Sequence, residues 1–397
     1  MDISTAQATS YHPDSDATRA RGQRIDSLDL VRGIVMVLMA IDHVRVYSGV
    51  PAGGPTAGVF LTRWVTHFCA PAFVFFAGTA AYLYGQSLGG DRKKLATFLL
   101  TRGALLVALE LTLIKFFWTF NFDYSQFVLL GVIWMLGWCM ILMAGLIWLP
   151  TTAIGVVGLA LIFGQQLVGG AFDAIRPSGG VGGTLLDILY LGNQTWPARM
   201  NILYVLIPWI GVMAAGYAFG RIMQKPAAER RKQLIFIGGI ATAAFVLIAG
   251  GITFFNAPAE NAPPALIRML NQQKYPASQL FLMMTLGPAI LLLPFVEGAR
   301  NRVSQWFVVF GRVPMFYYLL HIPLIHLLSL ATMKLRGASG MSQWYANAPY
   351  TQVPEDQRWS LLTLYGVFFV AVAILYPACR WYAKAKAEKR SPWMKYI

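Results

Sequence analysis

Charged side chains are scarce in this 397-residue chain: 12% of its residues are Asp, Glu, Lys or Arg, whereas 57% are hydrophobic. Soluble domains carry about 25% charged residues, so the scarcity excludes an ordinary soluble protein. The few charges are unevenly divided, with 32 basic and 17 acidic residues and a net charge of +15. In a soluble protein that excess would suggest nucleic acid as a partner. In so apolar a chain it indicates membrane topology instead, and we expect no nucleic-acid binding.

Cysteine is also scarce, and the common catalytic motifs are missing. Cys69, Cys139 and Cys379 lie in or beside apolar segments without CxxC spacing, so we expect small core residues and not a disulfide framework or a thiolate metal site. The sequence has no HExxH, GxSxG, Walker A loop or GxGxxG opening a soluble helix. Its histidines lack the spacing of metal ligands and its carboxylates are few. We therefore expect no metal site.

Long apolar runs, in contrast, are abundant. They predict an all-α, polytopic integral membrane helix bundle with about ten transmembrane helices, because each run can cross a hydrocarbon core about 30 Å thick. The runs occupy 28–46, 64–85, 95–118, 126–149, 151–170, 199–222, 234–254, 278–297, 305–332 and 359–381. The polar segment 1–23 has no signal-peptide pattern and is expected to be a disordered cytoplasmic tail. A single transmembrane domain at 24–383 and a basic tail at 384–397 complete the predicted organisation.

The distribution of basic residues predicts the orientation. If the N-terminus is cytoplasmic, the majority of the Lys and Arg residues also face the cytoplasm, which is the usual bias. These residues lie in the N-terminal tail and in the segments GGDRKK at 89–94, RIMQKPAAERRK at 221–232, GARNR at 298–302 and WYAKAKAEKR at 381–390. Both termini are therefore placed in the cytoplasm. The outward loops are rich in aromatic, Asn and Gln residues, which suits a neutral polar ligand such as a sugar, although interfacial aromatic belts explain part of this composition.

The most informative stretch is RIDSLDLVRGIVMVLMAIDHVRVY at 24–47. Ionisable groups inside a membrane helix are costly unless they are paired, so they are candidates for function. Arg32 and His43 are eleven residues apart, which places them within about 20° of each other around a helix and roughly 16 Å apart along it. Asp29 lies on nearly the same stripe. The alternative is that Arg32 and His43 are boundary residues at the two membrane surfaces, but that explanation does not require a shared face.

This stretch resembles two families. The pattern R-(I/L)-x-S-(L/V)-D-x-x-R-G, followed by an apolar run, looks like the opening helix of bacterial membrane proteins related to heparan-α-glucosaminide N-acetyltransferase. An Arg followed eleven positions later by a His is similar to the first-helix signature of the acyltransferase-3 family. The resemblance extends from about residue 24 to about residue 380. Further matching segments are HFCAPAFVFFAGTAAYL at 67–83, QKYPASQLFLMMTLGP at 273–288 and FGRVPMFYYLLHIPLIH at 310–326.

The resemblance implies a membrane acyltransferase of the bacterial cytoplasmic (inner) membrane. The donor would be cytoplasmic acetyl-CoA or another acyl-CoA, and the acceptor an amine or hydroxyl of an extracytoplasmic glycan or glycolipid. Such a protein would work in the lipid bilayer, with a homodimer as one possible assembly. Acyl transfer needs a base or nucleophile beside the carbonyl group and a positive group for the anionic donor. We therefore assign His43 as base or transient acyl carrier and Arg32 to the CoA phosphates.

The resemblance also leaves one ambiguity. In the lysosomal acetyltransferase the histidine associated with catalysis belongs to the first outward loop, whereas the segment 48–62 of this chain contains no histidine. Either His43 or His67 takes that role, or the activity has not carried over. We favour His43, because it has the acyltransferase-3 spacing. A structural, hydrogen-bonded histidine is the better interpretation of His326 and is open for His67.

Three further residues join His43 in the candidate catalytic set, namely Asp42, Glu110 and His321. Asp42 is the immediate sequence neighbour of His43 and does not reach its ring easily, so Glu110 or Asp123 is the more plausible partner for that ring. Glu110 lies within an apolar run and must pair or be protonated. An ion pair that merely holds the helices together explains it as well as catalysis does.

The candidate binding residues beside Arg32 are Asp29, His67, Arg312 and Tyr317. Arg32, Arg102 and Arg312 are the possible partners of Glu110. We expect Arg32, His43, Glu110 and His321 to converge on one polar cavity, because each would otherwise be isolated in an apolar surround.

Two other functions remain open from the sequence. A transporter or flippase would use the same intramembrane charges as a substrate path, and it should have inverted repeats with helices broken at the midplane. No such symmetry is visible in the sequence. A catalytically silent membrane scaffold is the third possibility. The sequence does not identify the acceptor, the acyl chain, N- or O-acylation, or the oligomeric state.

Overall fold

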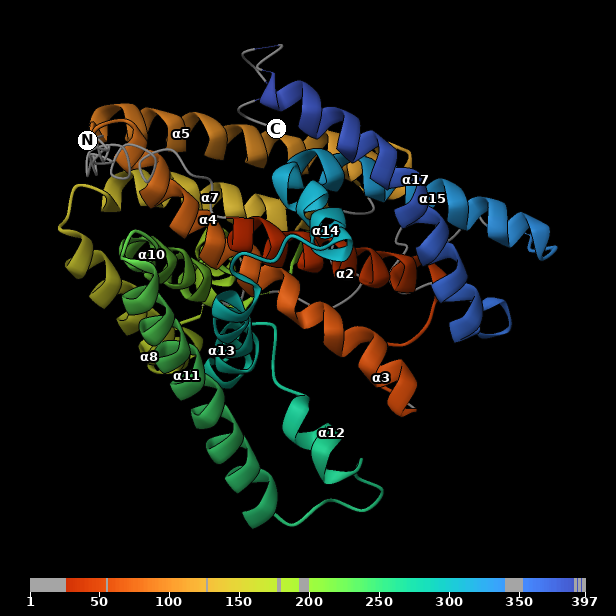
Figure 1. Ribbon diagram of the computed structural model, residues 1–397. Coiled ribbons are helices and arrows are strands. Elements are labelled where there is room, and N and C mark those ends of the chain that lie inside the picture. Colours follow the sequence, from red (N-terminus) through yellow and green to blue (C-terminus); the bar gives the residue numbers. More distant parts are fainter. Residues whose placement is uncertain are drawn as a thin grey trace, which may run out of the picture.

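The computed structural model describes residues 26–54, 56–125, 128–176, 180–192, 200–339 and 353–388, with Ser391 and Met394. The predicted tail at 1–23 and half of the predicted tail at 384–397 lie outside these residues. In the described part nearly every element is a helix, and the helices pack side by side in one bundle (Figure 1). The predicted class, an all-α polytopic membrane bundle, is confirmed.

Helix α2 (Asp26–Ser48) crosses the middle of the bundle (Figure 1). It is 23 residues long, or about 34 Å at 1.5 Å per residue. Buried side chains lie on all sides of it, which is the pattern of a helix enclosed by others. Its neighbours are α3 (Ala57–Trp64), α4 (Cys69–Ser87), α13 (Gln279–Val296), α14 (Arg302–Arg312), α15 (Pro314–Leu335) and α17 (Leu361–Ala387).

Two glycines bring α2 and α14 into direct backbone contact. A Cβ atom on Gly33 would collide with the carbonyl oxygen of Phe307, and one on Gly311 with the carbonyl oxygen of Asp29. Small residues permit this close approach between membrane helices, where van der Waals packing holds the helices together. The contact fixes the half of α2 that carries Asp29 and Arg32.

The remaining elements surround this core. Helix α10 packs against α4 and α8, α11 against α13, and α5 against α7. Their bounds are η1 (Val65–Phe68), α5 (Arg92–Leu109), η2 (Glu110–Ile114), α6 (Lys115–Thr119), α7 (Val132–Leu146), α8 (Thr151–Ala174), α9 (Gly180–Leu186), η3 (Asp187–Leu191), α10 (Leu206–Met223), α11 (Ala227–Phe255), α12 (Ala265–Leu270) and η4 (Glu355–Gln357).

Within the described ranges, eight helices are long and apolar enough to cross a membrane, against about ten predicted. Helices α2 and α7 occupy the other two predicted positions. Helix α2 carries three acidic and two basic residues, and α7 has only 15 residues. The single span predicted at 305–332 is wrong. The chain there forms α14 and α15, separated at Val313, because Pro314 has no N–H to continue a helix but is favoured in a first turn.

The helices predicted to start at 126 and 199 start at Val132 and Leu206, and a short strand precedes each of them. Strand β1 (Val128–Leu130) pairs in parallel with β2 (Met200–Ile202), and Leu129 is opposite Asn201. Each strand leads into the N-terminus of a helix, β1 into α7 and β2 into α10. The pairing therefore ties these two helix starts together.

Candidate functional site

Two histidines from helices far apart in the sequence meet inside the bundle. Nδ1 of His43, on α2, lies 2.5 Å from Nε2 of His321, on α15. The two rings are nearly parallel, with centroids 4.7 Å apart and an interplanar angle of 23°. His321 is fully buried, whereas His43 is half-buried. The ring partner of His43 is thus another histidine, and the prediction of Glu110 or Asp123 in that role is wrong.

The backbone of α15 fixes the second nitrogen of His321. Its Nδ1 lies 2.7 Å from the carbonyl oxygen of Tyr318 and 3.1 Å from that of Tyr317. These residues precede His321 by one turn, and helical side chains point back towards the preceding turn. The ring of Tyr317 also stacks on His321 with centroids 5.2 Å apart. His321 is therefore held by its own helix before it contacts His43.

The other neighbours of the His43 ring are aromatic. Trp118 meets it edge-on with centroids 5.0 Å apart, and Tyr318 does so at 6.3 Å. Tyr47, one turn further along α2, stacks on Trp118 and donates its hydroxyl hydrogen to the Trp118 carbonyl oxygen at 2.9 Å. The imidazole pair thus lies in a largely apolar surround, where polar contacts are stronger than in water.

A cavity of about 320 Å³ lies between α2, α4, α5, α7 and α15. Its lining is mostly apolar, but it includes the two cations Arg32 and Arg102. Met36 lines it one turn along α2 from Arg32, and Tyr318 lines it from α15. Since Tyr318 also touches the His43 ring, the cavity reaches from the arginines to a direct neighbour of the histidine pair.

Arg32 also has a partner on its own helix. Its Nη1 lies 3.4 Å from Oδ1 of Asp29, whose side chain is 3% exposed. At the same end of α2, Arg312 of α14 forms a more exposed ion pair with Asp26 at 3.5 Å. Asp29, Arg32 and Arg312 therefore gather at one end of α2, away from His43.

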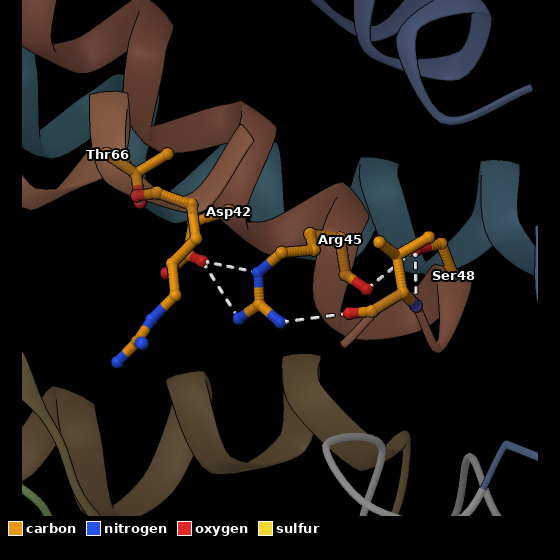
Figure 2. A network of polar contacts seen from close by, with 6 residues as sticks. Asp42, Arg45, Ser48 and Thr66 are labelled. Atoms are coloured by element: carbon orange, nitrogen blue, oxygen red, sulfur yellow. Dashed lines mark hydrogen bonds and ion pairs between the residues drawn. The ribbon is translucent and has the colours of Figure 1, made fainter. Parts of the chain in front are cut away.

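Asp42 forms an ion pair one turn along α2. Its Oδ1 accepts from Nε of Arg45 at 3.0 Å and lies 3.0 Å from Nη2 of the same guanidinium (Figure 2). Arg45 in turn donates to the carbonyl oxygen of Val50 at 3.2 Å. Thr66 lies beside Asp42 in Figure 2. Asp42 is thus engaged by Arg45, a partner that was not predicted from the sequence.

Glu110 is fixed by backbone amides. Its Oε2 accepts from the N–H of Ile133 at 3.1 Å and of Trp134 at 3.2 Å, in the first turn of α7. Gly131 makes room for this carboxylate, because a Cβ there would lie 2.6 Å from Oε1. A carboxylate at a helix N-terminus satisfies free N–H groups and complements the helix dipole. Glu110 therefore caps α7 through backbone amides, and not through the interhelical ion pair that the sequence had left open beside a catalytic role.

The other candidates are enclosed. His67 is 1% exposed, faces Phe281, and has no hydrogen-bond partner for either ring nitrogen within the described part of the chain. The hydroxyl of Tyr317, also buried, has no partner among the described residues. His326 bonds through Nδ1 to the carbonyl oxygen of Phe117 at 3.0 Å, which confirms its interpretation as a hydrogen-bonded structural histidine.

The predicted convergence is therefore only partial. His43 and His321 are in contact, and Arg32 lines a cavity that reaches their neighbour Tyr318. Glu110 does not line that cavity. Two residues at the site were missed from the sequence as site residues, Arg102 and Tyr318. Arg102 carried a usable signal, a cation within an apolar run, whereas nothing in the sequence distinguished Tyr318 from its neighbour Tyr317.

A third residue missed from the sequence lies on the loop between α12 and α13. Lys274 is 8% exposed, and its Nζ lies 5.1 Å from the ring centroid of Tyr275. Burial works against its charge, but the electrostatic influence of Tyr275 and Asp42 prevails, so the pKa of Lys274 is raised. A buried ammonium group therefore stays charged near the end of α2 that carries Asp42 and His43.

Comparison with known proteins identifies the family. No curated protein matches the chain. A family model described as heparan-alpha-glucosaminide N-acetyltransferase, catalytic, matches residues 24–252. The matched region is more than half of the chain and contains Arg32, His43 and Glu110, whereas His321 lies beyond it. The chain belongs to the heparan-alpha-glucosaminide N-acetyltransferase catalytic family.

Proposed function

We propose that this protein is a membrane acyltransferase of the bacterial cytoplasmic membrane, with both termini in the cytoplasm. It moves an acyl group, preferably acetyl, from cytoplasmic acyl-CoA to an amine or hydroxyl of a glycan or glycolipid on the opposite side. The domain at 24–383 carries the activity. Family membership supports the reaction class. The observation that carries the proposal is the cavity that extends from Arg32 and Arg102 to Tyr318, the neighbour of His43.

The chemistry of this cavity suits an acyl-CoA. Arginines form charge-assisted, often bidentate hydrogen bonds with phosphates, and two of them line the cavity. The rest of the wall is mostly apolar, which suits the pantetheine arm and the acyl group. At one end of α2 Asp29 accompanies Arg32, so Arg102 is an important second cation for a polyanionic donor.

The reaction that follows needs few groups. The acceptor N–H or O–H attacks the acyl carbonyl carbon while His43 takes its proton. The C–S bond then breaks, and the CoA thiolate leaves and takes that proton from His43. The products are the acylated acceptor and free CoA, so atoms and charges balance. A histidine can alternatively carry the acyl group itself between the two half-reactions.

A donor-cavity variant tests this function. Purified protein in lipid nanodiscs is incubated with radiolabelled acetyl-CoA and bacterial glycolipids, and label in the lipid fraction is counted. Ala80 lines the cavity from α4, so Ala80→Phe should fill the cavity and abolish transfer. Val156 is exposed on α8 and away from the cavity, so Val156→Phe serves as the matched control and should transfer normally.

The transfer assay and a second assay in proteoliposomes distinguish the alternative functions. Full transfer by Ala80→Phe would contradict the assignment of the cavity to the donor. Movement of glycolipid across proteoliposomes by the wild-type protein, without CoA and without label transfer, would indicate a flippase in place of an acyltransferase.

A further inference from the structure

The contact between His43 and His321 determines where the protons of both rings lie. A carbonyl oxygen only accepts hydrogen bonds. Nδ1 of His321 lies 2.7 Å from the carbonyl oxygen of Tyr318 and 3.1 Å from that of Tyr317, so this nitrogen must carry a hydrogen. A neutral imidazole has one N–H and one lone pair. Nε2 of His321 therefore has the lone pair.

The same reasoning extends to His43. Its Nδ1 lies 2.5 Å from Nε2 of His321. Because that Nε2 has a lone pair and no hydrogen, Nδ1 of His43 must donate. The neutral ring of His43 then has its lone pair on Nε2. Two buried rings in such close contact do not both carry charge, because burial and mutual repulsion oppose it. The nearest carboxylate along α2, that of Asp42, is occupied by Arg45.

We propose that His321 is a positioning residue, which holds His43 in the Nδ1–H tautomer so that Nε2 of His43 receives the acceptor's proton. This inference rests on the proposed acyltransferase function and adds the role of a residue outside the region matched to the family. His321 is fully buried and is not among the residues that line the cavity. Its Nε2 faces His43 and its Nδ1 faces backbone carbonyl oxygens, so it acts through His43, and the catalytic role expected for it from the sequence becomes a supporting one.

The arrangement also explains how the pair functions during transfer. When Nε2 of His43 takes a proton from the acceptor, the imidazolium retains its hydrogen on Nδ1 and donates it to a neutral Nε2 of His321. Hydrogen bonds from a charged donor are stronger than neutral ones, so this bond supports the charge that forms on His43. His43 then returns the Nε2 proton to the leaving thiolate, and both rings regain their starting protonation.

Nitrogen NMR of the full-length protein in nanodiscs tests the tautomer directly. The protein is labelled with ¹⁵N-histidine, and the five histidines are assigned by single substitutions. We expect His43 of the wild-type protein to show a protonated Nδ1 and an unprotonated Nε2 at neutral pH. A protonated Nε2 with a bare Nδ1 on His43 would overturn the proposal, whatever the activity.

Two variants of His321 provide the functional arm. His321→Gln retains a side-chain carbonyl to accept from His43 and an amide to donate to the backbone, so it should keep the tautomer and most of the activity. His321→Phe retains the ring but no acceptor, so His43 should shift towards the Nε2–H tautomer, and transfer should fall about 10- to 100-fold, the usual cost of losing a group that orients a histidine. His326→Gln, on the same helix, is the matched control and should change neither readout at His43.

The NMR and activity measurements distinguish a failure of the positioning role of His321 from a failure of the proposed acyltransferase function. Equal activity in His321→Phe and His321→Gln would overturn the positioning role. The expected tautomer in the wild-type protein together with full activity in His43→Ala would leave the hydrogen-bond chain intact but contradict the proposed role of His43. If His321→Phe does not fold, the tautomer of His43 in the wild-type protein and the activity of His321→Gln decide the question.

Discussion

Arg32 pairs with Asp29 one turn earlier on α2, with 3.4 Å between Nη1 and Oδ1. Asp29 is almost fully buried, and α14 packs against the backbone at this point through Gly311. Removing the cation of a buried pair leaves its partner charge poorly compensated, which commonly costs about 3–5 kcal/mol. The arginine therefore has a structural role as well as the proposed contact with the donor.

We predict that Arg32→Ala lowers the melting temperature in detergent and that the double variant Asp29→Asn/Arg32→Ala is more stable than Arg32→Ala alone. The reason is that the second change removes the carboxylate charge that the first leaves behind. Thermal unfolding of the two single variants and the double variant measures this coupling. Additive destabilisation by the two changes would show that the ion pair contributes nothing.

A variant of Arg102 tests donor binding apart from the stability effect expected for Arg32→Ala. Arg102→Gln should raise the KM for acyl-CoA about tenfold or more, the effect of losing one charge-assisted hydrogen bond. The value of kcat should change less, because a phosphate contact is shared by the ground and transition states. Arg92→Gln is the control, since Arg92 lies at the start of α5 and bonds to the Trp148 carbonyl oxygen outside the cavity. An unchanged KM in Arg102→Gln would contradict the proposed donor site.

Glu110 should behave as a structural residue. Glu110→Ala leaves the buried N–H groups of Ile133 and Trp134 without their acceptor, and each such loss costs about 1–3 kcal/mol. Glu110→Gln retains a side-chain oxygen and should preserve most of the stability and activity. Melting temperatures and transfer rates of both variants provide the measurement. A folded Glu110→Gln protein without activity would show instead that the charge takes part in catalysis.

The orientation in the membrane can be tested at the two ends of one helix. Ala228 and Glu260 lie at the start and just beyond the end of α11 and are both exposed. The native cysteines are buried, so they give little background. With both termini in the cytoplasm, an impermeant thiol reagent added to intact cells should label Glu260→Cys but not Ala228→Cys. The reverse labelling would overturn the orientation.

Apolar length and charge were sufficient to predict the helical class of this fold, because membrane spans need about 20 apolar residues each. They did not locate the break between α14 and α15, although Pro314 marks it. The interruption is short, and the apolar pattern continues across it. The strands β1 and β2 were missed for a related reason, since three-residue strands add no periodic signal and pair over a long distance in the chain.

For the functional residues too, the sequence revealed their positions but not their partners. The helical spacing of Arg32 and His43 was visible in the sequence, and both residues lie on α2. The partner of His43 was not predictable, because His321 is 278 residues away and its ring is oriented by backbone carbonyls. The partners of Glu110 are backbone amides of α7, and no residue type in the sequence marks them.

The rate of label transfer by His43→Ala shows directly whether His43 is the proton acceptor in acyl transfer. A positioned general base contributes about 10²- to 10⁴-fold, so transfer at saturating donor should fall by that factor while the melting temperature stays near that of the wild-type protein. His67→Ala, measured in parallel, should retain activity if it folds. Undiminished transfer by folded His43→Ala would contradict the account.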